Sequence, residues 1–117
     1  MIIGRVMKGE GVAGKLYGVP TANLDAMVMK EHGVYAARVR FDAQQFDGVV
    51  CIQPGKTEVH LLDYKGNLYG RELRVELLEK VSDFTAFRDE ASMRDKIQSD
   101  VDLVRTFLYG TFGADFA

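Results

Sequence analysis

The chain has 117 residues, of which 47% are hydrophobic and 27% are charged. These values are typical of an ordinary soluble globular protein with one core, so we expect a single domain over residues 1–117. The net charge is −2, and Lys and Arg are spread along the chain rather than clustered. We therefore do not expect duplex nucleic acid as the main partner, because binding to its phosphate backbone requires a concentrated basic patch.

Cysteine and histidine content limits the chemistry further. One cysteine, Cys51, leaves no internal disulfide and is typical of a reducing cytoplasm, where we expect this protein to reside. The two histidines show no metal-ligand spacing with Cys51, which argues against a zinc site. No apolar run approaches the ~18 residues of a spanning helix, and the N-terminus lacks the features of a secretory signal, so neither a membrane nor export is expected.

Short β-type runs dominate the first two-thirds of the chain. Residues 1–8 predict a first strand. Residues 34–41 predict a second, with one face formed by alternate apolar residues and the other by arginines. Further strands are expected over residues 46–52, entered through a turn at 42–45, then over 58–64 and over 72–79. The apolar face of the second strand comprises Tyr35, Ala37, Val39 and Phe41.

The period changes near residue 90. Apolar residues recur at helical spacing to residue 109, and Gly110 is suited to end the helix. Regularly spaced short strands followed by one amphipathic helix predict a mainly β fold, a small antiparallel barrel with a C-terminal α-helix packed on it. Helices do not alternate with the strands, so a βαβ nucleotide fold is not supported.

A glycine-rich segment follows the first strand. Residues 9–15 match the first seven positions of the GxxxxGK phosphate loop, but Leu16 stands where Ser or Thr would hold magnesium. Gly18 and Pro20 also prevent a helix from opening there, and a true Walker loop is therefore rejected. Glycines still let backbone N–H groups approach an anion, and Lys15 supplies a positive charge. The segment remains a candidate phosphate-binding loop.

Thr21 and Asn23 lie just after the proline corner. The Thr21 hydroxyl and the Asn23 carbonyl are hard oxygen donors, which Mg²⁺ accepts while it keeps several waters. Two neutral ligands would leave the charge of the metal for nucleotide phosphates. Side chains of these types more often make turn bonds to the backbone, and spacing alone favours that interpretation.

Glu58 and His60 form a second candidate. They point to the same face of an expected strand, and Glu58 at its start could take a proton from a hydroxyl nucleophile. The alternatives are a solvated surface carboxylate and a partly buried structural histidine, and periodicity does not decide between them.

Together these segments resemble the riboflavin kinase (flavokinase) family over residues 4–108. The resemblance lies in the combination of several motifs rather than in any one of them. They are Gly4-Arg5-Val6, Gly14-Lys15-Leu16-Tyr17-Gly18-Val19-Pro20-Thr21-Ala22-Asn23-Leu24, Gly33-Val34-Tyr35-Ala36, Glu58-Val59-His60-Leu61-Leu62-Asp63-Tyr64, Leu68-Tyr69-Gly70 and Ile97-Gln98-Ser99-Asp100.

The resemblance implies a six-stranded Greek-key barrel that transfers the ATP γ-phosphate to the 5′-hydroxyl of riboflavin and gives FMN. Glu58 would be the general base, and Thr21 and Asn23 would hold Mg²⁺ with the nucleotide phosphates. The flavin ring would lie near the strand that contains Val75, Leu78 and Lys80. The implied nucleotide-binding residues are Gly11, Gly14, Lys15, Gly18, Thr21, Asn23 and His60.

The chain departs from the family pattern in two places. Residues 50–57 are shorter than in the family and place Cys51 at the position of an asparagine, and residues 80–84 lack an expected arginine. A divergent flavin- or nucleotide-binding module with little turnover is the alternative, and a third possibility is a kinase for another hydroxyl compound. No adenylyltransferase domain is implied for this chain, and we expect a monomer with riboflavin and ATP as its small-molecule partners.

Overall fold

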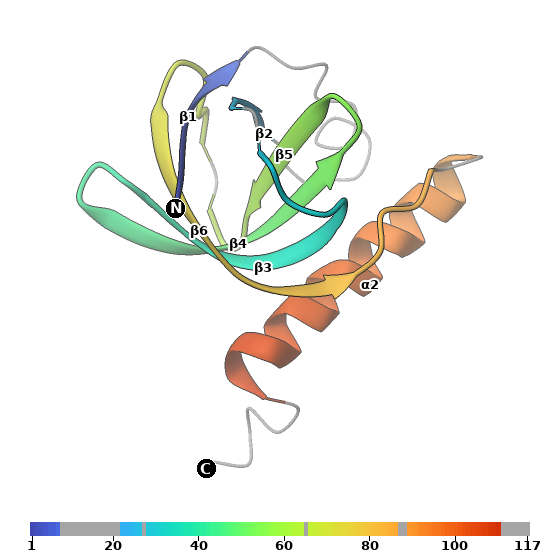
Figure 1. Ribbon diagram of the computed structural model, residues 1–117. Coiled ribbons are helices and arrows are strands. Elements are labelled where there is room, and N and C mark those ends of the chain that lie inside the picture. The colour runs from blue at the N-terminus through green and yellow to red at the C-terminus, as the bar shows by residue number, and fades with distance from the viewer. Residues whose placement is uncertain (8–21, 27, 65, 87–88, 111–117) are drawn as a thin grey trace.

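Six strands close into an antiparallel barrel in the computed structural model, which describes residues 1–7, 22–26, 28–64, 66–86 and 89–110 (Figure 1). Around the barrel the order is β1-β2-β5-β4-β3-β6. Strands β3, β4 and β5 are successive neighbours and β6 returns beside β3, which is a Greek-key arrangement. The expected fold class is confirmed. The strands are β1 (Ile2–Met7), β2 (Ala22–Asp25), β3 (Gly33–Phe41), β4 (Gln44–Gln53), β5 (Lys56–Leu61) and β6 (Glu72–Ser82).

Strand β2 was not among the strands expected from alternation. It pairs with β1 on one side and with β5 on the other, and it thereby closes the barrel. Ala22 and Leu24 are buried in the interior, at 4% and 3% exposure. A strand of four residues is too short for a period-2 signal, and its formation depends on the two neighbours that pair with it.

Two tight turns connect the central strands. Asp42 and Ala43 have φ of 50° and 60°, as in a two-residue type I′ hairpin turn, so β4 begins at Gln44. The predicted turn over 42–45 is therefore two residues too long. Pro54 and Gly55 connect β4 to β5, and Gly55 has a φ of 70°, which favours glycine. Strand β5 ends at Leu61 rather than at 64, because Asp63 takes a positive φ of 58°.

The barrel interior is the main core. The predicted apolar face of β3 is confirmed, since its residues are buried there together with Val50, Val59 and Leu73. Arg38 and Arg40 are exposed on the opposite face of the same strand. The period-2 alternation of β3 thus separates the barrel interior from its outer surface.

Strand β6 is longer than predicted and irregular. Its register against β3 shifts between Val34 and Tyr35 and again between Ala36 and Ala37. Leu78 and Val81 are the extra residues at these two points. Such bulges break the alternation, which explains why the sequence pattern ended the strand at 79.

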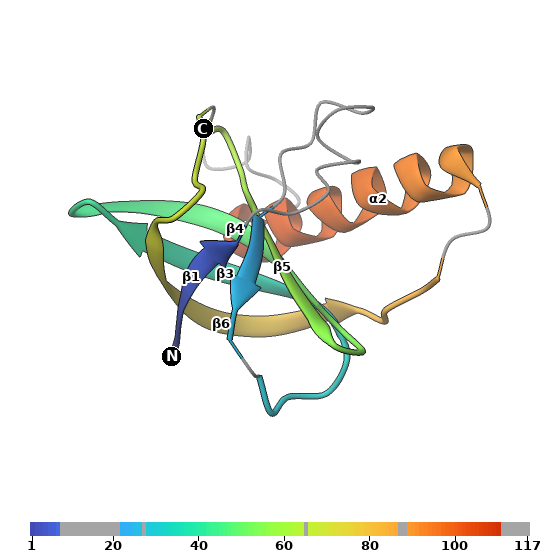
Figure 2. The same cartoon turned by 90° about the horizontal axis from the view of Figure 1, so that it is seen from above.

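Helix α2 (Glu90–Tyr109) lies outside the barrel and crosses one side of it, as both views show (Figures 1 and 2). Asp89 caps its start by accepting from the Ser92 amide, and Gly110 ends it with a φ of 80° and an N–H bond to Thr106. Val104 is fully buried against the outer residues Val34 and Ala36 of β3. No helix in the described ranges is long and apolar enough to cross a membrane.

Candidate functional site

Asn23 on β2 and Glu58 on β5 lie directly opposite one another in the antiparallel ladder. Their chain neighbours Ala22 and Val59 point into the barrel, so both side chains emerge on its outer face. Opposite residues on one face have Cβ atoms about 5 Å apart. The fold therefore brings together the predicted amide ligand and the predicted base, which are far apart in the sequence.

The same outer row continues across the sheet. Glu58 is opposite Cys51 on β4, Cys51 is opposite Val34 on β3, and Val34 is opposite Ser82 on β6. The two residues of each pair lie on the same face of the sheet. The row therefore runs from Asn23 on β2 to Ser82 on β6, one of the strands on which α2 packs. The candidate site therefore borders the interface between helix and barrel.

The side-chain oxygen of Asn23 has an unusual environment. Its Oδ1 is buried, and no hydrogen-bond partner for it exists among the described residues. A buried polar atom without a partner is costly in a native protein and is a common mark of a ligand-binding position. A neutral carbonyl oxygen is also a donor that a hard divalent cation accepts, so the residue fits the implied metal. In the same ranges no three acidic, histidine or cysteine side chains form a metal cluster.

Two side chains of the β4–β5 hairpin interact with the Glu58 carboxylate. The Gln53 amide donates from Nε2 to Oε1 of Glu58 at 2.7 Å, and Lys56 Nζ lies 3.9 Å from Oε2. Gln53 and Lys56 are opposite one another on either side of the Pro54–Gly55 turn. The carboxylate keeps about a quarter of its side-chain surface exposed, at 25%. It is thus oriented and still accessible.

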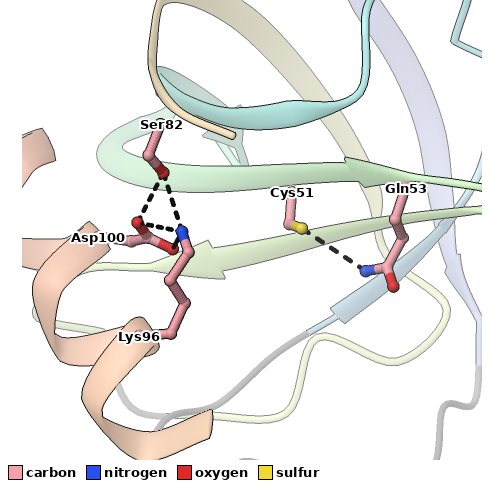
Figure 3. A network of polar contacts seen from close by, with 5 residues as sticks. All are labelled: Cys51, Gln53, Ser82, Lys96 and Asp100. Atoms are coloured by element: carbon pink, nitrogen blue, oxygen red, sulfur yellow. Dashed lines mark hydrogen bonds and ion pairs between the residues drawn. The ribbon is translucent and has the colours of Figure 1, made fainter. Parts of the chain in front are cut away.

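Cys51 lies beside this carboxylate and is half-buried with a free thiol. Gln53 Nε2 also approaches its Sγ at 3.6 Å (Figure 3). Burial, with further contributions from the negative charges of Glu58 and Asp100, raises the pKa of the Cys51 thiol to about 11. The thiol is therefore protonated near neutral pH and is a poor nucleophile.

A polar cluster connects α2 to the end of this row (Figure 3). Lys96 Nζ lies 2.7 Å from both carboxylate oxygens of Asp100, and the Ser82 hydroxyl donates to Asp100 at 2.7 Å. Asp100 is only 6% exposed. Sequence reasoning missed the cluster as a unit, although the i, i+4 spacing of Lys96 and Asp100 was a signal for the pair. Nothing in the sequence indicated Ser82.

The three residues predicted near the flavin lie in different environments. The Val75 side chain is fully buried in the barrel interior, on the opposite face from Glu58. Leu78 is at the β6 bulge and is partly exposed. Lys80 forms ion pairs with Asp83 at 2.9 Å and Glu31 at 3.3 Å, and these contacts raise its pKa. Because the interior holds Val75, its side chain is not accessible from the surface that carries Glu58.

The remaining predicted residues divide into two groups. His60 is two residues after Glu58 on β5, opposite Val49, and is partly exposed on the outer face of the barrel. The other residues lie outside the described ranges, namely Gly11, Gly14, Lys15, Gly18 and Thr21.

The closed six-stranded barrel with its outer helix defines the chain as a small β-barrel domain, and comparison with known proteins identifies the family. The riboflavin kinase (flavokinase) profile matches residues 1–108. Since this match covers nearly the whole chain, the chain belongs to the riboflavin kinase family.

Individual relatives agree with this assignment. The chain is 33% identical to a bifunctional riboflavin kinase/FMN adenylyltransferase of Haemophilus influenzae, which it matches over 91% of its own length and 38% of the relative. The corresponding enzyme of Pseudomonas fluorescens is 36% identical over 89% of this chain and 37% of the relative. An RNA-binding riboflavin kinase of Bacillus subtilis is 30% identical over 89% of this chain and 49% of the relative. The chain therefore spans less than half the length of these relatives.

Among solved structures, a crystal structure described as a macrolide-efflux protein from Streptococcus pneumoniae has a TM-score of 0.81 and 26% identity, over 89% of this chain and 38% of that one. The barrel with its outer helix is therefore also present as part of a longer chain.

Proposed function

We propose that this chain is a riboflavin kinase, which transfers the γ-phosphate of ATP to the 5′-hydroxyl of riboflavin and releases FMN and ADP. The observation that carries the proposal is the pairing of Asn23 with Glu58 on adjacent strands. An amide oxygen that could hold a metal ion and a carboxylate that could act as base, at neighbouring positions, would serve transfer of a phosphoryl group to a hydroxyl. Membership of the riboflavin kinase family supports this choice of substrates.

Asn23 is the residue that would hold Mg²⁺, together with Thr21 from outside the described ranges. Its buried Oδ1 lacks a partner among the described residues, which supports a role as ligand. When bound, the ion would neutralise charge on the nucleotide phosphates. The Gly11 to Gly18 segment, with Lys15, is proposed to cover the same phosphates, and His60 to border the nucleotide on the outer face of β5.

Glu58 is proposed as the general base. Its carboxylate accepts the proton of the ribityl 5′-hydroxyl while the oxygen forms a bond to the γ-phosphorus and the bond to the ADP oxygen breaks. Phosphoryl transfer depends mainly on positioning and charge neutralisation, so a small rigid barrel is sufficient for it. The partly exposed carboxylate, at 25%, supports access by a substrate hydroxyl.

The flavin ring is proposed to lie near the end of β6. Leu78 at the bulge and Lys80 in its ion pairs remain candidates there, whereas the Val75 side chain is buried in the barrel interior. We also propose a cytoplasmic monomer.

The direct test is incubation of the purified protein with ATP, Mg²⁺ and riboflavin, followed by chromatographic detection of FMN. The proposal requires FMN above the enzyme-free control, with loss of product when the metal is chelated. Flavin binding without formation of FMN would instead support a divergent binding module. The short Pro54–Gly55 hairpin favours this alternative. Faster phosphorylation of a different hydroxyl compound would identify a kinase with another acceptor.

A further inference from the structure

The β4–β5 hairpin supplies two side chains that hold Glu58. Gln53 and Lys56 are cross-strand partners next to the Pro54–Gly55 turn; Gln53 forms a hydrogen bond with the carboxylate, and Lys56 lies within ion-pair distance of it. The Gln53 amide donates a hydrogen bond from Nε2 to Oε1 of Glu58 at 2.7 Å. Lys56 is 3.9 Å from Oε2, which is beyond hydrogen-bond distance. Among the described residues, Oε1 therefore accepts a hydrogen bond and Oε2 accepts none, so Oε2 is the oxygen that can take a proton from a substrate.

The chemistry of the two groups determines how the Gln53 amide is oriented. An ionised carboxylate only accepts hydrogen bonds, so the atom of Gln53 that faces Glu58 must be Nε2. This nitrogen has two protons, and its second contact is the Cys51 sulfur at 3.6 Å. Both contacts restrain the amide, and the amide in turn restrains the carboxylate.

We propose that Gln53 is a positioning residue for the base, which holds Oε1 of Glu58 so that Oε2 faces the substrate hydroxyl. The inference rests on the proposed kinase function and deepens it. Efficient transfer requires the base within hydrogen-bond distance of the hydroxyl, and a carboxylate free to rotate spends only part of its time in that geometry. Gln53 acts through Glu58 and does not touch the reacting atoms.

A purely structural role for Gln53 is the competing explanation. In that case the side chain would only stabilise the hairpin, and its loss would lower stability and activity regardless of what stands at position 58. Coupling between the two positions separates the explanations, because residues that act as one unit have non-additive effects on turnover.

The experiment measures kcat and KM for both substrates in wild type, Gln53→Met, Glu58→Gln and the double variant. Methionine has a similar length but donates no hydrogen bond. Gln45→Met is the matched control on the same strand, since Gln45 contacts Arg40 at the far end of β4. Gln53→Asn serves as a second variant if Gln53→Met does not fold, because the shorter amide cannot reach the carboxylate.

We expect about a tenfold lower kcat for Gln53→Met, with both KM values within about twofold of wild type. Gln45→Met should leave kcat unchanged, and Gln53→Met should cause no further loss in the Glu58→Gln background. Wild-type kcat in Gln53→Met, or losses that add in the double variant, would overturn the positioning role while the kinase function stands. An inactive wild-type protein would overturn the kinase function and, with it, this inference.

Discussion

Asn23 on β2 and Glu58 on β5 are direct cross-strand partners on the outer face of the barrel. Asn23 has a buried amide oxygen without a partner among the described residues, and Glu58 has a carboxylate oriented by Gln53. One strand pair therefore combines a buried amide oxygen that lacks a partner among the described residues with a carboxylate that accepts a hydrogen bond from Gln53. Because the two residues are on different strands, the proposed metal ligand and the proposed base can be tested separately by substitution.

Glu58→Gln is expected to lower kcat by about 100-fold or more, because a general base typically contributes 10²–10⁴-fold. Binding of nucleotide should stay within about threefold of wild type, since the amide preserves the shape of the side chain. Turnover measured by FMN formation and binding measured by calorimetry check the two parts. Glu76→Gln on β6, where Glu76 is exposed, is the matched control. Full activity of Glu58→Gln would remove Glu58 from the mechanism.

Asn23→Ala is expected to affect ligand binding and stability in different ways. Removal of a buried, unsatisfied oxygen should leave the free energy of unfolding without ligand unchanged within about 1 kcal/mol, or raise it. The rise in Tm that Mg²⁺ and ATP cause in wild type should be largely lost, because a ligand stabilises the folded protein less when its Kd is higher. Thermal scans with and without Mg²⁺–ATP measure both effects. An undiminished rise in Tm would argue against Asn23 as a metal ligand.

Asp100→Ala should destabilise the contact between helix and barrel. Lys96 would lose both carboxylate contacts in a partly buried position and would keep the Ser82 hydroxyl at 3.0 Å. Loss of one member of a buried ion pair typically costs about 3 kcal/mol or more. Urea denaturation gives the free energy of unfolding. Asp102→Ala is the control on the same helix, since Asp102 is exposed, and should change stability by less than about 0.5 kcal/mol. If Asp100→Ala lowered the free energy of unfolding as little as Asp102→Ala, the cluster would contribute little to stability.

Cys51 should react slowly with iodoacetamide in the folded protein. Its pKa is raised from 9.0 to about 11, and each pKa unit lowers the thiolate fraction about tenfold, so at pH 8 alkylation should be about 100-fold slower than in the urea-unfolded chain. Mass spectrometry over time measures both rates. Similar rates in the folded and unfolded chain would show that burial does not suppress the thiolate.

The same shift predicts a dependence of stability on pH. Because the folded-state pKa lies above the unfolded value, the contribution of Cys51 to stability is fully present below pH 9.0 and is lost as the pH rises towards about 11. Cys51→Ala should therefore lose less stability than wild type between these pH values. Identical slopes for the two proteins in urea denaturation would contradict the shift.

Some elements could be predicted because their cause is local. The apolar face of β3 and the span of α2 follow from side-chain periods of 2 and 3.6, which a single segment contains by itself. Strand β2 could not be predicted in this way, because four residues hold too little pattern and pairing with β1 and β5 forms the strand. The bulges of β6 likewise depend on the register against β3.

Composition, side-chain period and motif are properties of the linear chain, and they were enough to predict the barrel class, the helix and the residues worth testing, among them Asn23 and Glu58. Three facts came from the folded barrel alone: these two residues are neighbours, Gln53 donates a hydrogen bond to the carboxylate, and Val75 lies in the interior. Contacts between side chains on different strands depend on sheet register, and register is set by pairing across the whole barrel.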